Sequence, residues 1–105
     1  MTKHIHIHVG KTKDESEKKG FVVRIDGNSV GNTIASSSSE AIAKARHGLV
    51  SVRKSGNNWR VKRKDGGTFD VDLNKGSTPE EVLRNLRVTV SELNGDPKYL
   101  HNAFN

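Results

Sequence analysis

Residues 58–64 read NWRVKRK, and residues 65–73 continue with DGGTFDVDL. Apolar residues alternate with polar or charged ones on both sides of the DGG triplet, which is the pattern of two strands with one buried face. Asp65-Gly66-Gly67 suits a three-residue hairpin loop with a glycine in the left-handed conformation. This loop sets the pairing of the two strands. The predicted opposite pairs are Trp59 with Leu73, Arg60 with Asp72, Val61 with Val71, Lys62 with Asp70, and Arg63 with Phe69.

The elements on either side of this hairpin complete a small unit. Leu49 to Lys54 predicts a further strand, which the turn Ser55-Gly56-Asn57 joins to the hairpin. Downstream, Thr78-Pro79-Glu80-Glu81 predicts the start of a helix, because the threonine caps it, proline suits its first position and glutamate completes a capping box. The predicted buried stripe of this helix is Val82, Leu83 and Leu86.

The first half of the chain shows a similar order of elements. His4 to Val9 alternates strictly between histidine and aliphatic residues, which predicts a half-buried strand. A polar, lysine-rich loop is expected from Gly10 to Gly20, followed by a strand from Phe21 to Asp26. After the turn Gly27-Asn28-Ser29, a weaker strand is expected from Val30 to Ala35.

A short helix closes this first half. Ser37 stands three residues before Glu40, which is the spacing of a capping box at a helix start. The helix then runs through Ala41 and Ala45, and Gly48 suits its end.

These patterns predict an α+β fold of antiparallel strands and short helices. A β-β-β-α unit occurs twice, as pseudo-repeats over residues 4–48 and 49–88, and Asp96-Pro97 predicts a last short helix over 96–105. With 105 residues the chain is expected to form one small domain, residues 1–105. Its core is expected to be thin, because only 31% of the residues are hydrophobic.

Composition excludes some classes of protein and favours others. The chain has no cysteine, which excludes disulfides and thiolate metal sites, and no apolar run approaches the length of a membrane span. We therefore expect a soluble, cytoplasmic protein with no membrane partner. Eighteen Lys and Arg against twelve Asp and Glu give a net charge of +6 and favour polyanionic partners such as nucleic acid. A basic surface that only keeps the chain soluble is the competing interpretation.

Three histidines on one strand face resemble a metal site. Successive histidines among His4, His6 and His8 are expected about 6.5–7 Å apart, so two of them are able to bind zinc or nickel. A third ligand is not evident, because His47 and His101 lie on predicted helices. We interpret the three histidines as an exposed polar face, with no metal or other cofactor.

Catalytic chemistry is not indicated elsewhere. Asp70 and Asp72 share one strand face, as magnesium ligands would, but the predicted pairing places Lys62 and Arg60 opposite them. Opposite charges across a hairpin are an ordinary stabilising device. No serine, histidine and acid arrangement is suggested by spacing, so the chain is not expected to be an enzyme.

Residues 49–87 resemble a known DNA-binding family. The matching residues are Ser51-Val52-Arg53-Lys54, Asn58-Trp59-Arg60-Val61, Gly66 and Thr78-Pro79-Glu80-Glu81. In this order they are similar to the three-stranded arm-binding domain of tyrosine integrases and to the related ethylene-response-factor DNA-binding domain. The resemblance implies that the sheet lies in the major groove, that the helix backs it, and that Arg53, Arg60 and Lys62 face the DNA.

The function predicted from these features is that of a small, non-enzymatic basic module. It is expected to bind DNA or another polyanion through the hairpin region 49–73. The residues predicted to bind nucleic acid are Arg53, Lys54, Trp59, Arg60, Lys62 and Lys64.

The alternative is a structural or assembly protein held by contacts between subunits. The thin core favours a chain helped by neighbours, and the alternating strand His4 to Val9 is able to pair edge to edge with another subunit. The compact, strand-led chain also resembles small gene products of tailed phages. That resemblance implies a virion-associated, oligomeric protein of the capsid-associated or decoration type.

Overall fold

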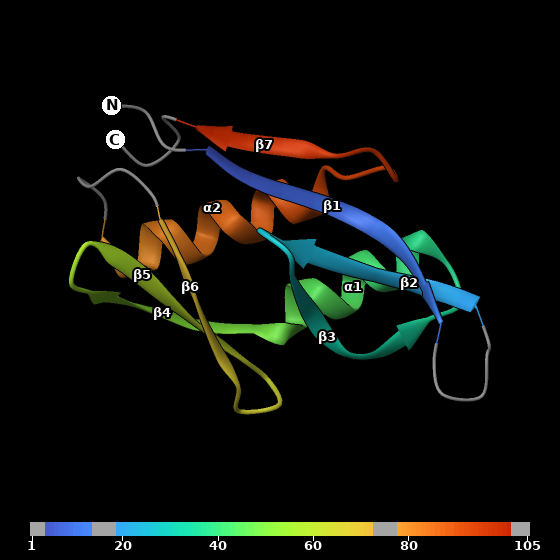
Figure 1. The fold of residues 1–105 in the computed structure, drawn as a ribbon, viewed down its shortest axis with the longest axis horizontal. Coiled ribbons are helices and arrows are strands. Elements are labelled where there is room, and N and C mark those ends of the chain that lie inside the picture. Colours follow the sequence, from blue (N-terminus) through green and yellow to red (C-terminus); the bar gives the residue numbers. More distant parts are fainter. Residues whose placement is uncertain (1–3, 14–18, 73–77, 102–105) are drawn as a thin grey trace.

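The computed structural model describes residues 4–13, 19–72 and 78–101, and it confirms an α+β fold of antiparallel sheets and helices (Figure 1). The order β-β-β-α occurs twice and a last strand follows. The elements are β1 (His4–Lys13), β2 (Lys19–Ile25), β3 (Asn28–Ala35), α1 (Ser38–Gly48), β4 (Leu49–Ser55), β5 (Asn58–Arg63), β6 (Thr68–Val71), α2 (Pro79–Ser91) and β7 (Lys98–His101).

Sheet A contains four strands in the order β3-β2-β1-β7. Strand β1 is therefore an interior strand, with Ile7 opposite Ile25 of β2 on one side and Ile5 opposite Leu100 of β7 on the other. Strand β7 pairs with β1 over His4 to Ile7, and β2 pairs with it from Ile7 to Lys13. Part of each edge of the strand that was expected to pair with another subunit is therefore occupied within the chain.

Strand β7 also corrects the predicted C-terminal helix over 96–105. Residues 98–101 are a strand, and residues 102–105 lie outside the described residues. The edge of β1 supplies backbone partners over the whole of β7, from His4 opposite His101 to Ile7 opposite Lys98. A helix start signal of two residues does not outweigh this tertiary pairing.

The first hairpin is longer than its side chains indicated. Pairing continues past Val9, with Lys11 opposite Phe21 and Lys13 opposite Lys19. The predicted loop from 10 to 20 is therefore wrong at both ends, and its middle, residues 14–18, lies outside the described residues. Backbone hydrogen bonds extend the ladder here without any need to bury lysine side chains.

Sheet B contains three strands in the order β4-β5-β6. The predicted pairing of its second hairpin is wrong by two residues: Trp59 lies opposite Val71, Arg60 opposite Asp70, Val61 opposite Phe69 and Lys62 opposite Thr68. The predicted partner of Trp59, Leu73, lies outside the described residues. Each side chain keeps its predicted face, because a shift of two residues preserves the period of a strand.

The hairpin loop explains this shift. Its three residues are Lys64, Asp65 and Gly66, and Gly66 alone is left-handed, with a φ of 93°. The amide of Gly66 donates to the carbonyl of Arg63 (3.0 Å), and the amide of Arg63 donates to the carbonyl of Gly67 (2.8 Å). The Asp65 carboxylate also accepts from the amide of Gly67 (2.8 Å), so Gly67 returns to the strand. The three-residue loop was predicted correctly in kind, but it begins one residue earlier.

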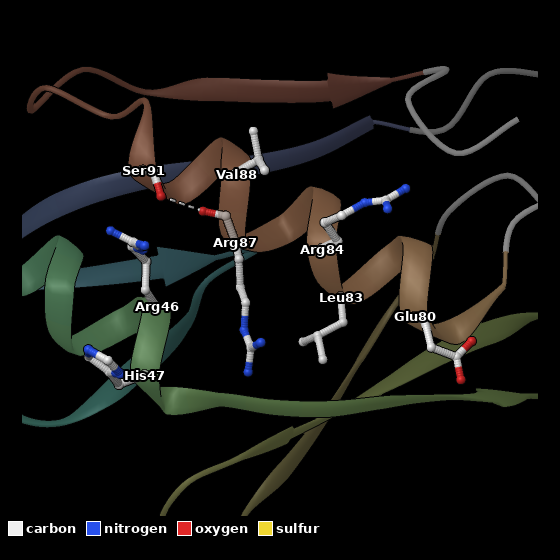
Figure 2. Close-up of a pocket in the computed structure, with 8 residues that line it drawn as sticks. All are labelled: Arg46, His47, Glu80, Leu83, Arg84, Arg87, Val88 and Ser91. Atoms are coloured by element: carbon white, nitrogen blue, oxygen red, sulfur yellow. Dashed lines mark hydrogen bonds between the residues drawn. The ribbon is translucent and has the colours of Figure 1, made fainter.

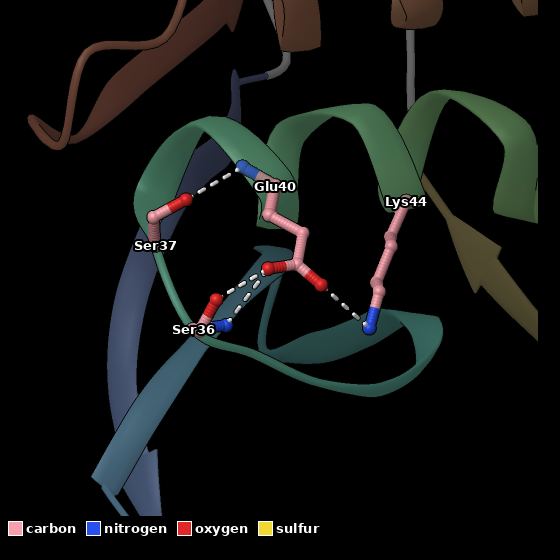
Figure 3. A network of polar contacts seen from close by, with 4 residues as sticks. All are labelled: Ser36, Ser37, Glu40 and Lys44. Carbon is pink, nitrogen blue, oxygen red and sulfur yellow. Dashed lines mark hydrogen bonds and ion pairs between the residues drawn. The ribbon is translucent and has the colours of Figure 1, made fainter.

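Both predicted helix starts are confirmed. At α1 the Ser37 hydroxyl accepts from the amide of Glu40 (3.1 Å), and at α2 the Thr78 hydroxyl accepts from the amide of Glu81 (3.2 Å). Figure 3 shows that Glu40 reaches back to Ser36, whose hydroxyl donates to its carboxylate at 2.6 Å. Hydrogen bonds from Ser36 and the ion pair with Lys44 (3.3 Å) lower the pKa of Glu40.

The helices pack on the sheets through one continuous core. Helix α1 packs against β2 and β3, while α2 packs against β4 and α1. A single cluster of buried side chains includes Val23 and Ile25 from the first unit and Val61, Val82 and Leu86 from the second. The outer faces of both sheets carry mostly polar side chains.

Candidate nucleic-acid interface

The outer face of sheet B brings together three of the predicted binding residues. Arg53 lies opposite Arg60 across the β4–β5 pair, and Lys62 is the next outward residue along β5. With Ser51 and Thr68 they line an open hollow of about 280 Å³. We call these five residues the basic face. Alternation places them on the side of the sheet opposite to α2, because Val52, Val61 and Val71 point inward and are buried.

Asp70 reduces the positive charge of the basic face. Its carboxylate accepts from Arg60 twice, at 2.9 Å from Nε and 3.4 Å from Nη2. The hydrogen bond from Arg60 lowers the pKa of Asp70, and the charges of Arg60 and Arg53 act in the same direction. The same bond raises the pKa of Arg60. Pairing of charges across this hairpin was predicted from the sequence, but the predicted partner of Arg60 was Asp72 instead of Asp70.

Two predicted binding residues lie on the other side of the sheet. Trp59 is only 3% exposed and belongs to the core between sheet B and α2. Lys54 lies opposite Trp59, and its Nζ sits 4.7 Å from the centre of a Trp59 ring. A ligand on the basic face therefore does not reach the indole. Its burial follows from alternation with Arg60, which the sequence already showed.

The last predicted residue, Lys64, lies in the hairpin loop. Its backbone amide donates to the carbonyl of Gly48 (2.9 Å), while its side chain is exposed. Arg63 beside it has a structural role: its guanidinium donates to the Ser29 carbonyl (3.2 Å) and lies over the Phe69 ring at 6.0 Å. Arg63 thus ties the end of β5 to the start of β3.

His6 and His8 of β1 lie on the outer face of sheet A. The rings of His6 and His8 stack with their centres 4.7 Å apart, and the side chain of His4 lies outside the described part of the chain. Within that described part, no three His, Cys, Asp or Glu side chains gather as metal ligands would. His101, expected on a helix, belongs to strand β7 and lies opposite His4.

A second basic region was missed by sequence reasoning. Arg46 and His47 end α1, and Arg84 and Arg87 stand three residues apart on α2. The spacing on α2 places both arginines on nearby parts of one helix surface, and this spacing could have revealed the basic region from the sequence. Only the fold shows that the end of α1 lies against this surface.

Comparison with known proteins gives no family for the chain. It matches no protein-family model, and neither the curated proteins nor the solved structures provide a match. Among the described residues, no helix is long and apolar enough to cross a membrane.

Proposed function

We propose that this protein binds DNA, or another polyanion with the same phosphate chemistry, through the basic face of sheet B. The observation that carries the proposal is the position of Arg53, Arg60 and Lys62 on the solvent side of one three-stranded sheet. Helix α2 packs behind the sheet through β4, so the face is rigidly supported and unobstructed by it. The same arrangement is implied by the resemblance to the integrase arm-binding and ethylene-response-factor domains.

The chemistry of the face favours contacts to phosphates. Lys and Arg neutralise phosphate charge and release counterions, while the hydroxyls of Ser51 and Thr68 are suited to donate hydrogen bonds to phosphate oxygens. A two- or three-stranded sheet fits the major groove of a duplex. Because Asp70 occupies part of Arg60, we expect binding of moderate strength that depends on salt more than on base sequence.

The test is fluorescence anisotropy of a labelled, mixed-sequence DNA duplex across a salt series. The double variant Arg53→Glu/Lys62→Glu reverses two exposed cations of the face without touching the core. We expect its affinity to fall at least tenfold, with a shallower dependence on salt. The matched control is Lys11→Glu/Lys19→Glu, which makes the same change of net charge on exposed positions of sheet A.

Equal losses in the two double variants would contradict the proposal, because general charge would then explain the binding. Absence of binding by the unmodified protein at low salt would reject it outright. Circular dichroism of each variant verifies that the fold is intact.

The rival function, a structural or assembly protein, draws on a different observation. Strand β4 is an edge of sheet B over its seven residues, and Val50 on it is 43% exposed. An exposed edge of this kind is able to add a strand from another subunit. Light scattering at high concentration separates the two functions, since a monomer at all concentrations contradicts self-assembly.

A further inference from the structure

A groove runs between the end of α1 and the exposed side of α2 (Figure 2). It has a volume of about 470 Å³. Its lining residues are Arg46, His47, Glu80, Leu83, Arg84, Arg87, Val88 and Ser91. The lining therefore contains three arginines and a histidine but a single carboxylate, that of Glu80 at the N-terminal end of α2. We call this region the helical groove.

Two of the three arginines of the helical groove have no polar partner among the described residues. No hydrogen bond or ion pair to another described residue engages the guanidinium groups of Arg46 and Arg84, whereas Arg60 on the basic face is held by Asp70. Arg87 is anchored by one bond, which Nη2 donates to the Leu49 carbonyl. Its side chain thereby spans from α2 toward β4, as Figure 2 shows, and its remaining N–H groups are available to a ligand.

The helical groove also contains apolar surface. Val88 is 50% exposed, and within the described residues the one other large hydrophobic side chain left exposed is Val50. Leu83 is half-buried and points into the space between α2 and β4 (Figure 2). The Ser91 hydroxyl is occupied, because it donates to the Arg87 carbonyl at 2.8 Å. Val88 and the half-buried Leu83 therefore line the same groove as Arg46 and Arg84, from different sides of α2.

We infer that the helical groove docks an acidic peptide segment of a partner protein, with carboxylates toward Arg46, Arg84 and Arg87, one apolar side chain against Leu83 and another against Val88. Charge complementarity selects the acid, since arginine binds carboxylates in a planar, two-bond geometry. Exposed apolar surface beside the cations selects a peptide over a nucleic acid backbone, because phosphates and sugars gain little from contact with valine and leucine.

The position of the groove makes this a second site. Helix α2 packs against the inner side of sheet B, whereas Arg53, Arg60 and Lys62 project from its outer side. A ligand in the helical groove thus contacts α1 and α2, whereas a polyanion on the basic face contacts the outer side of sheet B. The proposal does not depend on the proposed function of the basic face.

The probe is a fluorescein-labelled peptide of about twelve residues, rich in glutamate and containing two leucines, measured by anisotropy in low salt. The double variant Arg46→Glu/Arg84→Glu is expected to weaken binding at least tenfold, since two attractions become repulsions. The matched control is Arg53→Glu/Lys62→Glu on the basic face, which carries the same charge change and is expected to keep the affinity within about twofold.

Two further measurements separate a docking groove from a general attraction between charges. Val88→Ser removes apolar contact at an exposed position without changing charge, and we expect it to weaken binding about threefold. A probe with serine in place of leucine is expected to bind at least threefold more weakly. Equal affinity for the two probes, or an equal loss in the control variant, would overturn the inference.

Nucleic acid is the remaining alternative occupant. If Arg46→Glu/Arg84→Glu weakened binding of the DNA duplex while the peptide failed to bind the unmodified protein, the groove would be part of a nucleic-acid surface and the inference would be rejected. Retained affinity of this variant for the duplex, together with loss of peptide binding, supports it.

Discussion

Arg60 of β5 and Asp70 of β6 lie directly opposite one another on the outer face of sheet B, joined by a bond of 2.9 Å between Nε and Oδ1. Both side chains are more than a third exposed, so the pair contributes little to stability. Its importance is electrostatic, because it places a carboxylate within the basic face. The charge of Arg53 also lowers the pKa of this carboxylate. The pair therefore lowers the positive charge that the basic face presents to a ligand.

Replacing this carboxylate tests that effect. Asp70→Asn keeps the shape of the side chain but removes its charge, which releases Arg60 toward a ligand. We expect affinity for a DNA duplex to rise several-fold and the dependence on salt to become steeper by about one phosphate contact. Fluorescence anisotropy across a salt series measures both quantities.

Asp26→Asn is the matched control, because it removes one negative charge at an exposed turn of sheet A. Asp26 has a φ of 52°, a conformation that asparagine adopts readily. A rise of the same size in both variants would show that net charge, rather than the basic face, governs the affinity.

Trp59 provides a second test of the interface. The indole is buried on the inner face, and its Nε1 has no hydrogen-bond partner among the described residues. Trp59→Phe loses some packing but also removes an unpaired donor, so we expect a net loss of stability of about 1 kcal/mol. Affinity for DNA is expected to stay within about twofold, because the ring does not reach the basic face.

Urea denaturation and duplex anisotropy measure the two effects. Arg53→Ala is the comparison, since it shortens a side chain of the basic face itself and should weaken binding. A Trp59→Phe variant that folds fully but binds DNA several-fold more weakly would contradict the prediction and show that the indole contributes to binding.

The strand faces and helix starts of this protein are predictable from local sequence. Alternation around Val61 and the Ser37 and Thr78 caps depend on neighbours within a few residues, and the structure agrees with each. The outward positions of Arg53, Arg60 and Lys62, which are proposed to bind the polyanion, follow from the same alternation along β4 and β5.

The features that could not be predicted from the sequence depend on competition between neighbouring groups or on contacts between distant ones. The position of the hairpin loop rests on which of two adjacent glycines becomes left-handed; in the structure this is Gly66, and the amide of Gly67 donates to the Asp65 carboxylate instead. Strand β7 depends on a free edge of β1, more than ninety positions away in the chain. The helical groove likewise needs α1 and α2 to be packed together, which no local pattern encodes.

The helix start at Ser37 gives a third prediction. Its hydroxyl satisfies the amide of Glu40, one of the donors left free at the first turn of α1. Ser37→Ala is expected to lower the free energy of unfolding by about 1 kcal/mol. Ser39→Ala, two residues later in the same exposed segment, is the control and is expected to change stability much less. Urea denaturation measures both, and equal losses would mean that the hydroxyl of Ser37 does not act as the cap.

The outer face of sheet A gives a final prediction, on pH. His8 lies between the ring of His6, stacked on it, and Arg24 of β2, which is opposite it in the sheet. Burial lowers the pKa of His8, and the charges of His6 and Arg24 lower it further. As the pH falls, His8 therefore takes up its proton in the unfolded chain before it does so in the folded protein.

Because the folded pKa lies below the unfolded one, the stability that neutral His8 contributes is fully present above about pH 6.5 and is lost as the pH falls through the folded pKa. We expect urea denaturation to show a lower free energy of unfolding at pH 5 than at pH 8, and a smaller difference in His8→Gln. Arg24→Gln should reduce the difference without removing it, since burial is the larger cause. A His8→Gln variant with an unchanged difference between the two pH values would assign the effect to other groups.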